Sequence, residues 1–275
     1  MNRIQLLLKQ KPLLVMGILN ATPDSFSDGG RFLSQEFAVK HALDMIQDGA
    51  DIIDVGGEST RPGAQPVSVA EELDRVIPII EAIRKQSEVA ISIDTVKPEV
   101  MRVAVNAGAD LINDVNALQA KDALHTCAEL NVAVCLMHMQ GEPRTMQNNP
   151  RYGNVVGDIK SFLAERIAAC EQAGISQDNI IVDPGFGFGK TLEHNLSLLK
   201  HLDGFQDLGL PILVGLSRKS MIGKILDADK VDDRLFGSLA AAVLAYAKGA
   251  RIFRVHDVKP SVDALKVCQA MSAAQ

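Results

Sequence analysis

The chain has few aromatic residues and no excess of positive charge. Among 275 residues there is no tryptophan and there are only two tyrosines, which leaves little surface for stacking nucleic-acid bases. The 28 Lys and Arg residues are outnumbered by 34 Asp and Glu, the net charge is -6, and the sequence has no basic tail or block. We therefore expect no nucleic-acid partner.

Cysteine is scarce and scattered. Cys127, Cys135, Cys170 and Cys268 show none of the paired spacings of zinc sites or redox dithiols. We interpret them as small core side chains in a protein of the reducing cytoplasm.

Long apolar runs are also missing. The amino-terminal residues 1–19 are largely apolar, but Lys9, Gln10, Lys11 and Pro12 interrupt them. The uninterrupted runs are too short for a membrane span, and the segment lacks the pattern of a signal peptide. We expect a soluble, cytoplasmic protein without membrane contacts.

Short apolar runs alternate with stretches of helical periodicity along the chain. Eight runs have the length and composition of buried strands: 13–19, 50–57, 89–95, 109–115, 132–138, 179–185, 211–217 and 250–256. Helical patterns are clearest at 36–50, 69–86, 158–174 and 234–249. Eight successive βα units predict an α/β fold, a (β/α)8 TIM barrel, with residues 1–275 in a single domain. A doubly wound open sheet is the alternative fold.

Polar side chains recur where the apolar runs end, which in a TIM barrel is where active sites are built. They are Asn20, Asp54 with Glu58 and Thr60, Asp94, Asn113 with Asp114, His138, Asp183, Arg218 with Lys219, and Arg254 with His256. One polar residue at a strand end is usually a helix cap or a turn former. Agreement among all eight strands favours a ligand site.

The charges of these groups differ along the chain. Strands one to six end mainly in carboxylates and amides, whereas the last two end in basic residues. Arg254 and His256 are two positions apart and share a strand face, at a place where TIM barrels commonly bind phosphate. Buried Asp94, Asn113 and Asp183 would need hydrogen-bond donors. The predicted ligand has a donor-rich planar head and an anionic tail. The alternative is that the acids form internal salt bridges with the basic residues.

The segment DPGFGFGKT, residues 183–191, contains alternate glycines but matches neither the Walker phosphate loop nor the dinucleotide fingerprint. Its glycines could let a flat ligand lie against the backbone, and a tight turn explains them equally well. Among the six histidines, only His138 and His256 lie at strand ends. No residue spacing predicts a tightly bound transition metal, whereas Mg²⁺ shared with ligand phosphates needs no such motif.

Eight segments resemble, in order, the motifs of the dihydropteroate synthase family, a pterin-binding TIM-barrel family. They are NATPDSFSDGG, DVGGESTRPG, IDTVKPEV, INDV, CLMHMQGEPRTMQ, DPGFGFGKT, GLSRKSMIG and RVHDV. The resemblance implies an enzyme of folate biosynthesis that joins 6-hydroxymethyl-7,8-dihydropterin diphosphate to 4-aminobenzoate, giving 7,8-dihydropteroate and diphosphate. It also implies Mg²⁺ as cofactor, small-molecule substrates as the partners, and a homodimer.

The resemblance also implies roles for residues. Pterin-binding residues would be Asp94, Asn113, Met137, Asp183, Phe188, Gly215, Lys219 and Arg254, and the catalytic ones Asp94, Asp183, Lys219 and Arg254. Diphosphate-binding residues would be Asn20, Thr60, Arg254 and His256, with Asn20 as the metal ligand. Aminobenzoate-binding residues would be Thr22, Pro23, Phe26, Ser59, Arg61, Pro62, Lys219 and Ser220. The polar segments 20–30 and 56–66 are predicted to close over the second substrate.

Three other functions fit part of this pattern. A methyltetrahydrofolate methyltransferase would share an acidic pterin pocket but gives no reason for the basic cluster. A Schiff-base aldolase could use Lys219 as its nucleophile. A non-catalytic pterin- or phosphate-binding protein would bind its ligand without turnover.

Overall fold

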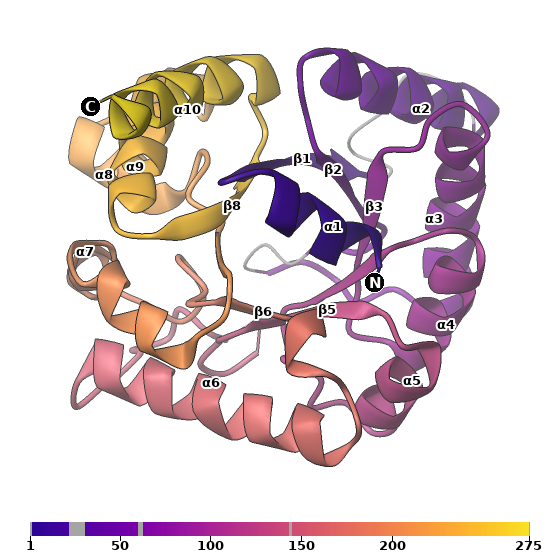
Figure 1. Ribbon diagram of the computed structural model, residues 1–275, viewed down its shortest axis with the longest axis horizontal. Coiled ribbons are helices and arrows are strands. Elements are labelled where there is room, and N and C mark those ends of the chain that lie inside the picture. Colours follow the sequence, from indigo (N-terminus) through magenta and orange to yellow (C-terminus); the bar gives the residue numbers. More distant parts are fainter. Residues whose placement is uncertain (1, 22–30, 60–62, 143–144, 275) are drawn as a thin grey trace.

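Eight parallel strands close into a barrel in the order of the sequence (Figure 1). The computed structural model describes residues 2–21, 31–59, 63–142 and 145–274, with only the helical backbone for 31–34. The strands are β1 (Leu14–Asn20), β2 (Ile52–Gly56), β3 (Ala90–Asp94), β4 (Leu111–Asp114), β5 (Ala133–Met137), β6 (Ile180–Asp183), β7 (Ile212–Val214) and β8 (Ala250–Val255). The predicted TIM barrel is confirmed, and the open sheet is wrong because β1 pairs with both β2 and β8. The single-domain organisation stays a prediction.

Helices surround the barrel. They are α2 (Arg31–Gln47), α3 (Val69–Arg84), α4 (Pro98–Asn106), α5 (Ala123–Leu130), α6 (Val155–Gln172), α7 (Leu192–Lys200), α8 (Ser220–Leu226), α9 (Leu235–Ala247) and α10 (Val258–Ala273), with short 3-10 turns η2 (Gln177–Asn179), η3 (Leu202–Leu208) and η4 (Asp232–Arg234). The four predicted helical patterns correspond to α2, α3, α6 and α9. Helix α3 begins where it does because Ser68 and Glu71 form a capping box, each side chain bonding the other's backbone N–H.

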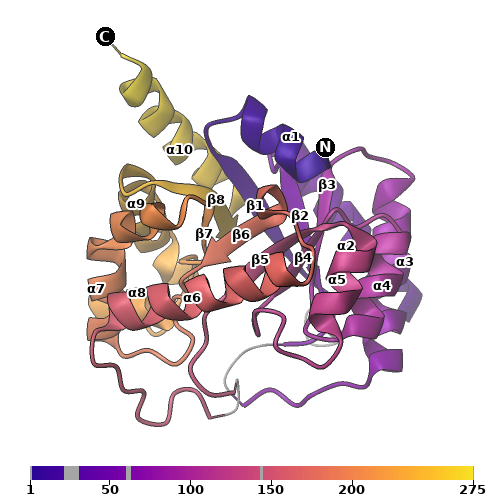
Figure 2. The ribbon, with the colours of Figure 1, turned by 60° about the horizontal axis from the view of Figure 1, so that its bottom comes forward.

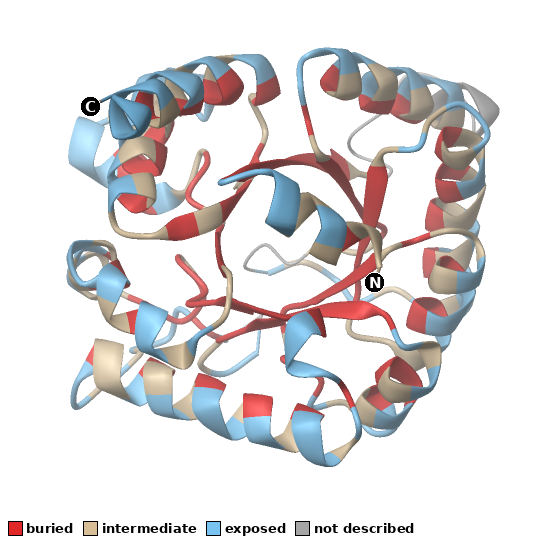
Figure 3. Ribbon diagram, in the orientation of Figure 1, coloured by how far each residue is buried: buried red, intermediate tan, exposed pale blue. Residues whose placement is uncertain are grey.

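The alternation of side chains along the strands separates two apolar layers. Outward-facing residues pack against helices whose buried sides face the barrel, as the burial colours show (Figure 3). Inward-facing residues fill the lower barrel: Leu14, Met16, Ile52, Ala90, Leu111, Ala133, Cys135, Ile181, Leu213 and Ile252. All four cysteines are free and buried, which confirms their interpretation as core side chains.

The amino-terminal opening of the barrel is covered by a helix that the sequence patterns did not predict. Helix α1 (Arg3–Gln10) lies across this opening (Figures 1 and 2), and its Ile4 packs on the inner apolar layer with 1% exposure. Arg251, at the start of β8, donates to the carbonyls of Leu8 and Lys11 at 2.9 Å each. Covering this end leaves the carboxyl ends of the strands as the place for a ligand.

No described helix combines the length and hydrophobicity that a bilayer span requires.

Candidate active site

Near the carboxyl ends of the strands, the inward-facing positions change from apolar to polar. The alternation that places Ile52 inside the barrel also places Asp54 inside, two residues further on. The same step brings inward Asp94, Asn113, Asp183 and Arg254, and the parallel register aligns neighbouring strand ends. The three acids and Asn113 are at most 8% exposed. A buried polar layer therefore lies on top of the apolar one.

Arg254 bridges two of the acids across the barrel. Its Nε donates to Asp54 Oδ2 at 2.6 Å, and its Nη2 donates to Asp94 Oδ2 at 2.7 Å. Asn113 Nδ2 also donates to Asp54, at 3.3 Å. The internal salt bridges considered as an alternative are therefore present at Asp54 and Asp94. Burial raises the pKa of Asp94, against the opposing effect of the Arg254 cation.

Asp183 and Lys219 stand apart from this bridge. Asp183 Oδ1 accepts from the backbone N–H of Gly185 at 2.7 Å, and burial raises the pKa of Asp183 to about 6. The Lys219 ammonium lies 4.1 Å from the centroid of the Phe188 ring. Burial, with the nearby Arg254 charge, lowers the pKa of Lys219 to about 8. Both groups are ionised at pH 7, so the site offers an acceptor and a donor to a ligand.

An apolar wall stands beside these charges. Phe188 and Met137 form a cluster with Val115 and Met146 that is separate from the two main cores. A flat apolar wall next to buried acceptors suits a planar heterocycle, whose faces are apolar and whose edge carries polar atoms.

His256 directly follows Val255, the last residue of β8. Its Nδ1 lies 3.1 Å from Ser217 Oγ, and burial together with the charges of Arg254 and Arg218 lowers its pKa to about 4. The imidazole is therefore neutral at pH 7. Arg218 forms an ion pair with Asp257, at 2.6 Å from Nη2 to Oδ1. Of the predicted basic residues, Arg218 thus has a structural partner, whereas Lys219 and Arg254 reach the polar layer.

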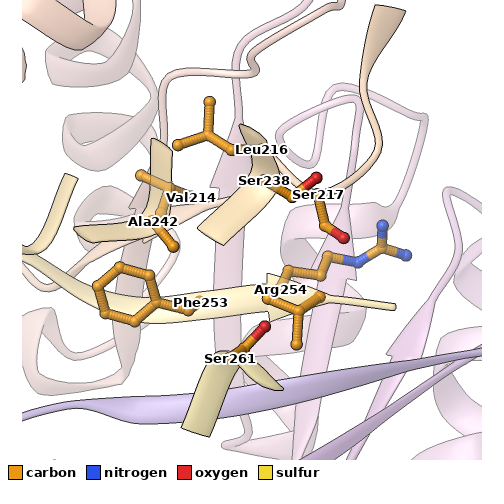
Figure 4. Close-up of a pocket in the computed structure, with 9 residues that line it drawn as sticks. Val214, Leu216, Ser217, Ser238, Ala242, Phe253, Arg254 and Ser261 are labelled. Atoms are coloured by element: carbon orange, nitrogen blue, oxygen red, sulfur yellow. The ribbon is translucent and has the colours of Figure 1, made fainter. Parts of the chain in front are cut away.

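A small cavity beside Arg254 is not the ligand site. It lies between the last two strands and helices α9 and α10, and it is lined by Val214, Leu216, Ser217, Ser238, Ala242, Phe253, Arg254, Val255 and Ser261. In Figure 4 the Arg254 guanidinium extends away from Phe253 and Ala242. The cavity belongs to the layer between barrel and helices, behind the polar groups.

Comparison with known proteins agrees with this geometry. Residues 16–256 match the family model described as "Pterin binding enzyme". The chain is 57% identical over 261 residues to the dihydropteroate synthase of Escherichia coli (strain K12), which covers 95% of this chain and 92% of that relative. The chain belongs to the dihydropteroate synthase family.

Solved dihydropteroate synthase structures share the barrel. The Xanthomonas albilineans enzyme with 4-aminobenzoic acid superposes with a TM-score of 0.92 at 51% identity, covering 96% of this chain and 95% of that chain. The enzyme from the same organism in complex with 7,8-dihydropteroate gives 0.89 at 48% identity, with the same coverage. The family and the transferase activity implied by the sequence motifs are confirmed.

The residues that the dihydropteroate synthase motifs suggest for the pterin lie at or near the carboxyl ends of the strands. Asp94, Asp183, Asn113 and Arg254 belong to the polar layer. Met137 and Phe188 belong to the apolar wall, and Gly215 and Lys219 follow β7. Asn20 is the last residue of β1. Ser59 lies in the segment after β2, and Ser220 is the first residue of α8. The roles of these residues stay predictions.

Part of the predicted site cannot be placed. Thr22, Pro23, Phe26, Thr60, Arg61 and Pro62 lie outside the described residues. The predicted closure of segments 20–30 and 56–66 falls largely on the same residues and stays a prediction.

Asp54 has a larger part in the polar layer than the sequence motifs indicated, and Lys190, two residues after Phe188, is buried. Asp54 was noted only as a strand-end acid, yet it accepts from both Arg254 and Asn113. Its inward position follows from the two-residue step after Ile52, a signal present in the sequence. Lys190 was not singled out, and it is 3% exposed. Conversely, Asp114 faces outward and accepts from the N–H groups of residues 116 and 118, so its role is to hold a loop.

Proposed function

We propose that this chain condenses 6-hydroxymethyl-7,8-dihydropterin diphosphate with 4-aminobenzoate to give 7,8-dihydropteroate and diphosphate. The observation that carries the proposal is the buried set of Asp94, Asn113 and Asp183 beside the Arg254 cation. These acceptors match the amino and ring N–H donors of a pterin. The Xanthomonas albilineans enzymes bound to 4-aminobenzoic acid and to 7,8-dihydropteroate support the same pair of substrates.

Pterin binding would use both kinds of charge in the layer. Asp183, with a single hydrogen bond from Gly185 among the described residues, accepts from the ring donors, and Lys219 donates to a ring acceptor. At Asp94 the ring donors share the carboxylate with Arg254, whose guanidinium packs over the ring and faces the diphosphate. Met137 and Phe188 contact the face of the ring.

The diphosphate would be held by Arg254, His256 and Thr60, with Mg²⁺ beside Asn20. The donor set fits this ion, because Asn20 offers one neutral oxygen at the end of β1, and Mg²⁺ is commonly bound by one or two protein oxygens plus phosphates and waters. No described group of three or more His, Cys, Asp or Glu residues is arranged for a metal ion. When bound, Mg²⁺ would neutralise charge on the leaving diphosphate.

The chemistry then depends on departure of the leaving group. The methylene C–O bond breaks with its electron pair going to diphosphate, and the electron-rich dihydropterin stabilises the resulting cation. Arg254 offsets the charge that develops on diphosphate. The amine lone pair of 4-aminobenzoate forms the new C–N bond, and the amine proton passes to solvent. Because a neutral aromatic amine is nucleophilic, Lys219, Ser59 and Ser220 serve to position the second substrate.

A homodimer is the proposed assembly, and the outer helices support it. Helix α9 buries Ala241, Ala242 and Ala245 against the core, so its small residues serve internal packing. Its other side exposes large apolar residues, and this surface extends over α8: Ile225, Leu226, Phe236 and Leu244 are 47–80% exposed. An apolar surface of this kind is typical of a subunit contact. Sedimentation of wild type and Phe236→Asp tests it: wild type should sediment as a dimer and the variant as a monomer.

The decisive experiment is an assay of diphosphate release with the pterin diphosphate, 4-aminobenzoate and Mg²⁺. Release should require all three. Tight pterin binding without release would instead indicate a non-catalytic binding protein. Trapping of a substrate on Lys219 by borohydride would indicate the Schiff-base aldolase.

A further inference from the structure

Lys190 is a buried cation that the proposed reaction does not use. It lies at the end of the glycine-rich segment and is 3% exposed. Its Nζ donates to the carbonyl of Phe188 at 2.9 Å and to the carbonyl of His138 at 3.3 Å, and it lies 3.1 Å from His138 Nδ1. Among the described residues, no carboxylate lies within salt-bridge distance of this ammonium. Burial lowers the pKa of this ammonium to about 7, against the opposing charge of Asp183. Burying a lysine side chain here is costly, which points to a role for its hydrogen bonds.

The bonds of Lys190 join two segments that are distant in sequence. His138 follows β5, and Phe188 lies in the segment after β6. The backbones of these segments are in direct contact: a Cβ at Gly185 would lie 1.9 Å from the His138 carbonyl oxygen, and one at Gly189 would lie 2.5 Å from that of Gln140. Gly185 and Gly189 therefore permit backbone to pack on backbone, which is a third explanation beside the two considered for these glycines. Lys190 adds a side-chain link between the same two segments, because its Nζ donates to a carbonyl of each.

Both segments carry the apolar wall of the site. Phe188 places its ring 4.1 Å from the Lys219 ammonium, and Met137 immediately precedes His138. A shift of the Phe188 backbone would move the ring away from Lys219. The Phe188 carbonyl is one of the acceptors that Lys190 holds.

We infer that Lys190 is a positioning residue for the pterin pocket: its buried ammonium ties the end of β5 to the glycine segment and thereby sets the Phe188 ring against Lys219. This inference rests on the proposed pterin site. The groups that face the ammonium are His138 and, at longer range, Asp183 and Lys219. Because Lys190 donates to neutral acceptors only, a neutral side chain of similar length removes the tie together with the cost of burying the charge. Stability and positioning can thus be separated.

The test compares Lys190→Met with Lys190→Arg, and uses Lys200→Met, on the exposed end of α7, as the matched control. For each protein, thermal unfolding, the KM for pterin diphosphate and the KM for 4-aminobenzoate are measured. We expect Lys190→Met to fold and to raise the pterin KM about tenfold, the size expected for a lost charged hydrogen bond, with a much smaller change in the aminobenzoate KM. Lys190→Arg should recover most of the loss, and Lys200→Met should match wild type.

Equal pterin KM values for wild type and Lys190→Met would overturn the inference, as would a parallel rise of both KM values. If Lys190→Met does not fold, Lys190→Gln, whose amide still donates to one carbonyl, serves the same comparison with a smaller expected rise. Failure of the proposed function is distinct, because the wild-type protein itself would then neither bind the pterin nor release diphosphate.

Discussion

The two ends of the barrel provide different partners for their acidic side chains. At the amino end, Asp110 accepts from Arg84 Nη2 at 2.8 Å and from the N–H of Ile91 at 3.0 Å. At the carboxyl end, within the described residues, the Asp183 carboxylate accepts only from the N–H of Gly185, and burial raises the pKa of Asp183 to about 6. The end covered by α1 pairs this half-buried carboxylate with the Arg84 guanidinium. The other end keeps an acid that a ligand's donors would stabilise.

This contrast separates residues that serve stability from residues that serve binding. A substitution at the covered end should change the free energy of unfolding and leave the kinetic constants alone. A substitution in the polar layer should change the kinetic constants and should not lower the free energy of unfolding, because burying an incompletely paired acid costs stability.

The largest effect is expected at Asp183. Asp183→Ala removes an acceptor for the pterin donors, so kcat/KM for pterin diphosphate should fall about a hundredfold or more. Steady-state kinetics measure this, with circular dichroism to confirm folding. Asp178→Ala, an exposed acid at η2, is the matched control and should behave as wild type. Normal kinetics for Asp183→Ala would remove the basis of the proposed site.

At the covered end, Ile4→Ala should act on stability alone. The side chain is 1% exposed inside the barrel opening, and its truncation should lower the free energy of unfolding by about 3 kcal/mol. Urea unfolding measures this change. Leu6→Ala on the same helix, at a position 40% exposed, should have a much smaller effect. A changed pterin KM in Ile4→Ala would show that the two ends are coupled.

The pH dependence of the reaction should reflect the polar layer. Asp183 must be ionised to accept from the pterin, and its pKa of about 6 means that binding is lost as pH falls through that value. Lys219 must be protonated to donate, and its pKa of about 8 means that binding is lost as pH rises through that value. The profile of kcat/KM for pterin diphosphate should therefore be a bell between these limits. Lys219→Arg should move the upper limb to higher pH, and an unmoved limb would assign it to another group.

The smallest effect is expected at Ser220, at the exposed start of α8. Ser220→Ala should raise the KM for 4-aminobenzoate by about threefold, the size of one lost neutral hydrogen bond, and leave the pterin KM unchanged. Ser176→Ala, an exposed serine far from the barrel mouth, is the control. An effect on the pterin KM instead would place Ser220 with the other substrate.

Much of the site could be predicted from the sequence because its signals are local. The two-residue period that puts Ile252 inside the barrel also puts Arg254 inside. The same period puts Asp54 inside the barrel, two residues after Ile52, although the sequence did not indicate its bonds to Arg254 and Asn113. Helix α1 was missed because its short apolar run is interrupted by polar residues and is helical mainly through its cap and its packing on the barrel.

The sequence by itself determined the number and order of the strands and which of their positions face inward, because side-chain alternation is a property of each extended segment. Only the tertiary structure decided which charges meet. Arg254 reaches Asp54, 200 residues away, because the barrel closes and brings the last strand beside the first. Lys190 is buried against two carbonyls because two segments pack backbone to backbone. Such pairings depend on distances that no local pattern encodes.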